Sequence, residues 1–155
     1  PDLTPLIRTA RQVNDAQPEY VLRLVERACG GSLAGTRVGV LGLAYKAGVD
    51  DLRESPAIQA AHLLKAAGAD VTAFEPYKPC AAVEGIKTAG TLEQILQGVE
   101  VLVLLVGHTV FKDLQPGQLA GMTPARVLVD CVDLWTDPAW KAAGFDVHRL
   151  GVGWR

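Results

Sequence analysis

The chain has 155 residues, of which 49% are hydrophobic, and its formal net charge is −2 at neutral pH. This length is typical of one domain with a single core, so we expect one domain with an appendage. The lysines and arginines are scattered, which disfavours nucleic-acid binding, and no apolar run is long enough to span a membrane. Because no charged-then-apolar leader opens the chain either, the sequence predicts a cytoplasmic protein.

The cysteines and histidines give no sign of a metal site. Cys29, Cys80 and Cys131 are odd in number and far apart, and the three histidines are equally dispersed. Since no pair of them has the spacing of metal ligands, we expect reduced cysteines and no metal. The chain opens at Pro1 and has Met122 as its one methionine, so we expect a piece of a longer protein.

The first 34 residues are predicted to form a helical arm. Apolar residues recur at helical spacing from Leu3 to Cys29, and Pro18 divides the run. Because proline lacks a backbone donor, the first helix should end or kink at residues 14–17, and a second should continue to Gly30. Residues 35–155 are predicted to form the α/β domain, and a simple packing helix remains the alternative for the arm.

The stretch RVGVLGLAYKAGVDDLRESP, residues 37–56, organises the rest of the chain. Its apolar start, residues 38–43, is typical of a central strand in a parallel sheet, and Gly39 and Gly42 allow a sharp turn or a close approach. The loop that follows leaves the carboxyl end of the strand, where open α/β sheets bind ligands. We therefore expect ligand contacts from this loop, which contains Tyr45, Lys46, Asp50, Asp51, Arg53 and Glu54.

The residues after this loop predict a helix and a second strand. Ser55 and Pro56 are a cap and a first helical residue, and Gly68 should end the helix before a strand over 71–74. Glu75 then follows at about the distance of the ribose-binding acid in a dinucleotide fold, which suggests a nicotinamide cofactor. The glycines are spaced G-x-x-G instead of G-x-G-x-x-G, however, so a simply solvated acid is the preferred interpretation.

The remaining elements alternate between strands and helices. A short edge strand over 85–88 and a helix from Thr91 to about residue 97 precede the most apolar strand, 99–106, which should be central. His108 follows on the ligand-binding edge, where it could contact a phosphate or sugar hydroxyl or cap the next helix.

The last third of the chain completes the predicted fold. It contains a helical turn at 118–122, a strand at 126–130, a helix at 138–143 and a strand at 146–149. Residues 151–155 give no structural signal. The alternation predicts right-handed crossovers and a Rossmann-like, doubly wound parallel sheet of about five to six strands, preceded by the helical arm.

Several motifs together resemble a known family. GLAYK at 42–46 and DDLRESPA at 50–57 resemble, in order and spacing, the signature of the C-terminal domain of UDP-glucose and UDP-N-acetylmannosamine 6-dehydrogenases. PLIRTARQVNDAQPEYV at 5–21 resembles the end of that family's central helical domain with its linker. LVGHTVFK at 105–112 is similar to the N-acetylmannosamine branch, where an acid often replaces Gly107.

The resemblance implies a division of labour between domains. Family enzymes oxidise a sugar CH₂OH to a carboxylate in two steps with two NAD⁺, through a thiohemiacetal on a cysteine. An N-terminal domain holds NAD, a central domain carries the cysteine, and the C-terminal domain holds the UDP part of the substrate. This chain should then contain no catalytic residue, be inactive alone and belong to a homo-oligomeric oxidoreductase. The ribose-binding role of Glu75 would be wrong.

Three residues of this chain match functional residues of the family by their position in the motifs. Tyr45 matches an aromatic, usually phenylalanine, near the substrate nucleotide, and Lys46 matches a lysine that contacts the UDP-sugar. Arg53 matches an arginine that helps hold NAD across the domain interface. The structural alternative for Arg53 is an ion pair with an acid of residues 50–54.

One departure from the family pattern bears on the substrate. Many members follow the strand matching 127–129 with Asp-x-Arg, whose arginine binds UDP, but here Asp130 is followed by Cys131 and Val132. The favoured function is the UDP-sugar-binding domain of an NAD-dependent dehydrogenase, with UDP-N-acetylmannosamine ahead of UDP-glucose. A separate NAD-binding module with Glu75 on the ribose and a non-catalytic interaction domain are the alternatives.

Overall fold

The computed structural model describes residues 5–152, and within them six parallel strands form one sheet. The strands are β1 (Arg37–Leu41), β2 (Asp70–Phe74), β3 (Lys87–Thr88), β4 (Val101–Leu104), β5 (Val127–Asp130) and β6 (Asp146–Arg149). Their spatial order is β3-β2-β1-β4-β5-β6. The order reverses between β1 and β4, as in a doubly wound Rossmann-type sheet, which confirms the predicted fold class.

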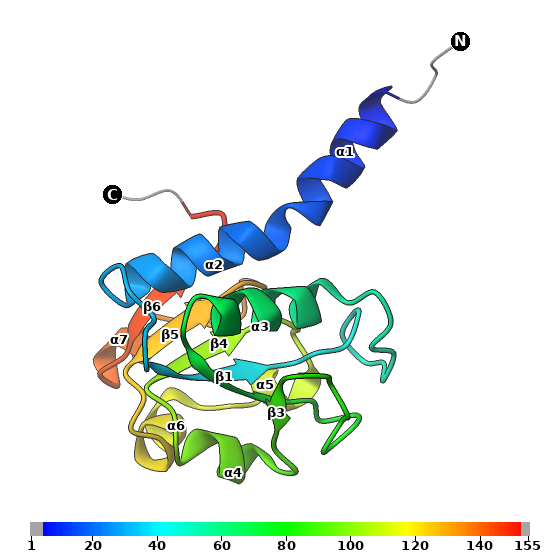
Figure 1. Cartoon of the computed structure of the whole chain (residues 1–155). Coiled ribbons are helices and arrows are strands. Elements are labelled where there is room, and N and C mark those ends of the chain that lie inside the picture. The colour runs from blue at the N-terminus through cyan, green and yellow to red at the C-terminus, as the bar shows by residue number, and fades with distance from the viewer. Residues whose placement is uncertain (1–4, 153–155) are drawn as a thin grey trace.

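Helices cover both faces of this sheet (Figure 1). They are α1 (Pro5–Asp15), α2 (Gln17–Ala28), α3 (Pro56–Ala66), α4 (Leu92–Leu96), α5 (Thr109–Lys112), α6 (Pro116–Met122) and α7 (Ala139–Ala142). Helices α2 and α3 lie on one face, and α4 to α7 contribute the buried side chains of the other. Central strands β1 and β4 are therefore buried along their length, apart from the exposed Arg37 at the start of β1.

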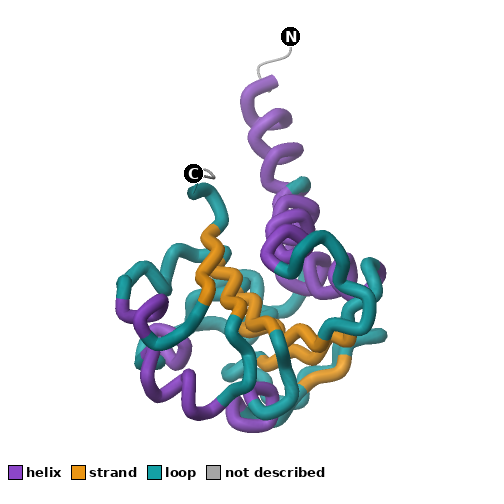
Figure 2. The backbone as a smooth tube through the Cα atoms, turned by 90° about the vertical axis from the view of Figure 1, so that its left-hand side faces the viewer, coloured by secondary structure: helices purple, strands orange, loops and turns teal. Residues whose placement is uncertain are grey.

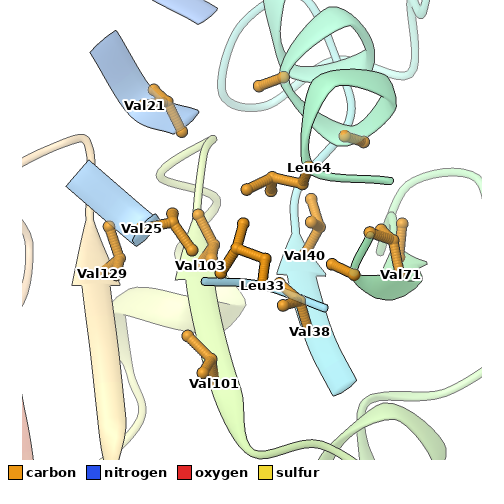
Figure 3. Close-up of a cluster of buried hydrophobic side chains, with 14 of the residues drawn as sticks. Val21, Val25, Leu33, Val38, Val40, Leu64, Val71, Val101, Val103 and Val129 are labelled. Atoms are coloured by element: carbon orange, nitrogen blue, oxygen red, sulfur yellow. The ribbon is translucent and has the colours of Figure 1, made fainter. Parts of the chain in front are cut away.

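The two hydrophobic clusters follow from the alternation of side chains along each strand. In β4, Val101 and Val103 face α2 and α3, whereas Leu102 and Leu104 face the short helices. Figure 3 shows part of the first cluster, in which Val103 lies near Val25 of α2 and Val40 near Leu64 of α3, with Val101 and Val38 further along the same two strands. The domain is thus built around its own two-sided core.

The helical arm divides where proline was expected to divide it. Helix α1 ends at Asp15, α2 begins at Gln17, and Pro18 occupies the first turn of α2. Helix α2 buries Val21 and Val25 against the sheet, whereas α1 buries no residue and projects away from the body of the domain (Figure 2). The boundary between residues 34 and 35 stays a prediction, although α2 is packed on the sheet.

The structure alters some element bounds. Strand β4 is shorter than the apolar run 99–106, because Leu105 and Val106 both turn their N–H groups to the carbonyl of Leu41 as the strand ends. Helix α5 begins directly after His108, where a helix was considered but given no bounds. Among residues 5–152, no helix combines the length and apolar character needed to cross a membrane.

Candidate functional site

Gly42 starts the loop that leaves the carboxyl end of β1. Its φ of +88° lies in the left-handed region, and an added Cβ would sit 2.6 Å from the Val106 Cβ. Only glycine fits both conditions, because a side chain would strain the backbone and collide with the segment after β4. The turn therefore depends on the glycine identified in the sequence.

Glu75 holds the base of this loop from inside the protein. Its Oε2 accepts hydrogen bonds from the backbone N–H groups of Leu43 at 2.8 Å and Ala44 at 2.9 Å. Its Oε1 accepts one from the N–H of Tyr77 at 3.0 Å. Because Glu75 is 1% exposed, the predicted ribose contact is wrong, and so is the preferred alternative of a solvated acid.

His108 is equally buried and also serves the loop. Its Nε2 lies 3.1 Å from Oε2 of Glu75, and the N–H of Gly48 donates to its Nδ1 at 3.1 Å. His108 occupies the position before the first turn of α5, but its side chain makes no capping hydrogen bond there. The sequence thus placed the residue on the correct edge, while a capping side chain and a direct ligand contact are both wrong for this buried ring.

Further hydrogen bonds close the loop and join it to α3. The N–H of Tyr45 donates to the carbonyl of Asp51 at 2.8 Å, which brings the two ends of the loop together. The Ser55 hydroxyl donates to the carbonyl of Ala44 at 3.2 Å and accepts from the N–H of Ala57 at the start of α3. The predicted cap therefore also fixes the helix to the loop.

Tyr45 and Lys46 project from this fixed backbone into solvent. Tyr45 is 61% exposed, and no ion-pair partner of the Lys46 ammonium occurs in the described part of the chain. Tyr45 lines two cavities, one of about 630 Å³ shared with Arg11 of α1 and one of about 540 Å³ shared with Arg53. The structure thus brings Tyr45 and Arg53 to one cavity, whereas Lys46 lines neither.

Arg53 forms the ion pair that was its structural alternative. Its guanidinium grips Asp51 with two hydrogen bonds, Nε to Oδ1 at 2.9 Å and Nη2 to Oδ2 at 2.8 Å. The Arg53 side chain is nevertheless 88% exposed, so it stays accessible from outside. Hydrogen bonds from the Arg53 side chain and backbone, with a smaller effect of the Lys78 charge, lower the pKa of Asp51 to about 2.

Replacement of Arg53 by glutamine should raise the pKa of Asp51 from about 2 towards its ordinary value near 3.8. A depressed pKa means that the pair stabilises the fold above pH 3.8 and that this contribution fades as the pH falls towards 2. Titration of the carboxyl ¹³C resonance by NMR measures the shift. Lys78→Ala is the matched control and should move it only slightly; a pKa unchanged in Arg53→Gln contradicts the assigned cause.

Asp130 organises the loop after β5. Its Oδ2 accepts from the N–H groups of Leu134 at 2.6 Å and Trp135 at 2.7 Å, and its Oδ1 accepts from that of Val132 at 3.0 Å. Val132 occupies the position of the arginine in the Asp-x-Arg pattern that the resemblance led us to expect, and its side chain lies against Gly107. Asp130 therefore stabilises the loop after β5, although no arginine follows it at residue 132.

The cysteines show no features of catalytic nucleophiles, and the described residues contain no metal-binding cluster. The three cysteines are unpaired, and burial, together with the charge of Asp130, raises the pKa of Cys131 to about 12. Such a thiol is a poor nucleophile because the thiolate is the reactive form. Among residues 5–152, no group of three or more His, Cys, Asp or Glu side chains is placed to hold a metal ion.

A doubly wound sheet with a loop of accessible cationic and aromatic side chains after its central strand is typical of nucleotide-binding domains. Residues 39–137 match the UDP binding domain of the UDP-glucose/GDP-mannose dehydrogenase family. The chain belongs to this family.

The relatives support the assignment over most of the chain. A UDP-N-acetyl-D-mannosamine dehydrogenase of Methanococcus maripaludis is 30% identical over 95% of this chain, and an NDP-N-acetyl-D-galactosaminuronic acid dehydrogenase of Ralstonia solanacearum is 36% identical over 88%. The solved UDP-glucose dehydrogenase of Pyrobaculum islandicum has a TM-score of 0.73 at 27% identity, covering 96% of this chain and 32% of its own. The chain spans only 34% and 31% of the first two relatives, about a third of their length.

Proposed function

We propose that this chain binds the UDP part of a UDP-sugar, as the C-terminal domain of an NAD-dependent nucleotide-sugar 6-dehydrogenase. The observation that carries the proposal is the rigid loop after β1, which presents Tyr45 and the unpaired Lys46 at the switch point of the sheet. From its family membership we further propose that the whole protein is a cytoplasmic homo-oligomer whose catalytic residues lie outside this chain.

The chemistry of the two side chains suits a uridine diphosphate. The Lys46 ammonium is a compact cation with three donors, which fits a phosphate or ribose oxygen. The exposed ring of Tyr45 offers a flat apolar face with a polar tip, to which a pyrimidine base or a ribose can pack. Because Glu75, Asp51 and His108 hold the backbone at Ala44, Tyr45 and Gly48, on either side of Lys46, little order is lost when the ligand binds.

The edge of this sheet does not fit NAD itself. The acid in the ribose-binding position, Glu75, is buried and occupied by backbone N–H groups. A long loop also separates β1 from the start of α3, where a dinucleotide site has a short glycine turn leading directly into the helix. NAD, which would accept the hydride, therefore belongs to another domain of the longer protein, with Arg53 as the contribution of this chain to holding it.

UDP-N-acetylmannosamine is the proposed substrate, with UDP-glucose as the alternative. Archaeal relatives named UDP-N-acetyl-D-mannosamine dehydrogenase align over 95–96% of this chain, and residues 105–112 resemble the motif of that branch. Val132 removes one arginine contact, so we expect the diphosphate to depend more strongly on Lys46 than in members that retain Asp-x-Arg.

Calorimetric titration of the chain with UDP, a UDP-sugar and NAD⁺ tests this function. UDP should bind, and Lys46→Ala should weaken binding by about 1.5 to 3 kcal/mol, the usual value of a charge-assisted hydrogen bond. Lys141→Ala, an exposed lysine on α7, is the matched control and should leave the affinity unchanged. Binding of NAD⁺ without any response to UDP would contradict the proposal, and binding of no nucleotide would favour an interaction domain.

A further inference from the structure

Glu75 and His108 are two fully buried side chains that make none of the proposed ligand contacts. They lie 33 residues apart in the sequence, at the carboxyl ends of β2 and β4. Because β1 lies between these two strands, their hydrogen bond spans the point at which the Lys46 loop leaves the sheet. A buried polar pair at that position needs a structural reason.

The hydrogen bonds define how the imidazole of His108 is protonated. The N–H of Gly48 donates to Nδ1, so Nδ1 carries no proton and acts as an acceptor. The neutral ring then carries its proton on Nε2 and donates it to Oε2 of Glu75. Each of the two ring nitrogens therefore has one partner, and the direction of both bonds is fixed.

One carboxylate thus holds both the base and the tip of the loop. Glu75 holds the base directly through the N–H groups of Leu43 and Ala44, and it holds the tip through His108 and Gly48. Gly48 follows Lys46 by two residues and has no atom within 4 Å of the position of an added Cβ. Gly48 is open on that side, and its hydrogen bond to the imidazole joins the tip of the loop to the segment that follows β4.

The ring of His108 is itself held by two aromatic side chains. The Tyr77 ring packs on it with centroids 4.9 Å apart, and Phe111 of α5 lies 6.0 Å away. The N–H of Tyr77 also donates to Glu75, so the same carboxylate fixes the residue that covers the imidazole. Such support limits the ring to one orientation.

We infer that His108 is a positioning residue for Lys46, which it orients towards the UDP diphosphate through its bond to Gly48. This inference rests on the proposed function, because it assigns the loop's order to the binding of that ligand. Glu75 fixes the tautomer of His108 in the way that an outer carboxylate fixes a metal-binding histidine.

Two substitutions of His108 separate hydrogen bonding from packing. An asparagine oxygen can replace Nδ1 as the acceptor for Gly48, whereas a glutamine amide can replace Nε2 and keep only the bond to Glu75. If His108 only fills space, glutamine is the better substitute because it is closer to histidine in size. If His108 positions the loop, His108→Asn should bind UDP better than His108→Gln.

The experiment measures amide hydrogen exchange at Gly48 and UDP affinity for the 155-residue chain and both variants, at a temperature where all three are folded. In His108→Gln, exchange at Gly48 should accelerate by about tenfold and UDP affinity should fall by about tenfold, the equivalent of one hydrogen bond. In His108→Asn, the slow exchange at Gly48 and the UDP affinity should both stay close to those of the unaltered chain. Trp140→Phe, a buried change on α7 of the same core, is the control and should alter neither.

The outcomes distinguish the inference from the function on which it rests. Unchanged Gly48 exchange in His108→Gln, or a better UDP affinity in His108→Gln than in His108→Asn, would overturn the positioning role. If the unaltered chain fails to bind UDP, the proposed function is overturned, and Gly48 exchange still decides whether His108 orders the loop.

Discussion

Gly42→Ala is expected to lower the free energy of unfolding by about 2 to 5 kcal/mol, the sum of left-handed backbone strain and overpacking. The added Cβ would lie 2.6 Å from the Val106 Cβ and 3.0 Å from that residue's backbone nitrogen and oxygen. Since a backbone cannot rotate away as a flexible side chain does, the segment after β4 must move. Denaturant unfolding followed by the fluorescence of the buried Trp135 and Trp140 measures the loss.

Two other glycines serve as controls that separate the causes. Gly35 has a φ of +74° but no atom within 4 Å of an added Cβ, so Gly35→Ala should show the strain alone, about 1 to 2 kcal/mol. Gly98 has neither feature, and Gly98→Ala should change stability by less than about 0.5 kcal/mol. A Gly42→Ala loss no larger than that of Gly35→Ala would show that the close approach to Val106 is unimportant.

Asp130→Ala is expected to lower the free energy of unfolding by about 3 to 5 kcal/mol. The carboxylate accepts three backbone hydrogen bonds in the loop after β5, and its removal leaves those N–H groups without an acceptor. The loop also places Trp135, which packs on Trp140 with ring centroids 5.2 Å apart. The change therefore loosens part of the second hydrophobic cluster as well.

Asp130→Asn and Asp146→Ala make this prediction specific. Asparagine keeps one oxygen for Leu134 and Trp135 but turns its amide towards the N–H of Val132, so the loss should be intermediate. Asp146 is exposed and bonds His148 at the surface, and its removal should cost less than about 1 kcal/mol. If Asp130→Ala and Asp146→Ala lowered the free energy of unfolding equally, the three hydrogen bonds of the buried Asp130 would not be important for stability.

The central strands could be predicted from sequence because parallel strands that helices cover on both faces are mostly apolar. The last strand, residues 146–149, was predicted at its observed bounds, and the caps at Ser55 and Thr91 were also predicted correctly. The run 99–106 was too long, since Val99 and Val106 are buried without belonging to the strand ladder. Apolar sequence reports burial, whereas strand pairing depends on where the chain turns.

The part of the site that lies within one continuous stretch of sequence could be predicted. The order of residues 42–57 placed Tyr45 and Lys46 on an exposed loop at the carboxyl edge, as the structure has them. The roles of Glu75 and His108 were not predictable, because their bond joins residues 33 apart and nothing in the sequence shows which way an acid at a strand end points. Helix α5 has four residues, too few for a helical period to be recognised.

Mapping of UDP binding by amide chemical shifts tests the central claim most directly. On addition of UDP to the ¹⁵N-labelled chain, the account predicts that shifts concentrate in residues 43–54 and 105–109, around the loop after β1 and the end of β4. Shifts confined to the cavity between α2 and the end of β6, lined by Arg23, Arg27 and Arg149, would contradict it. A spectrum that UDP leaves unchanged would contradict UDP binding by this domain altogether.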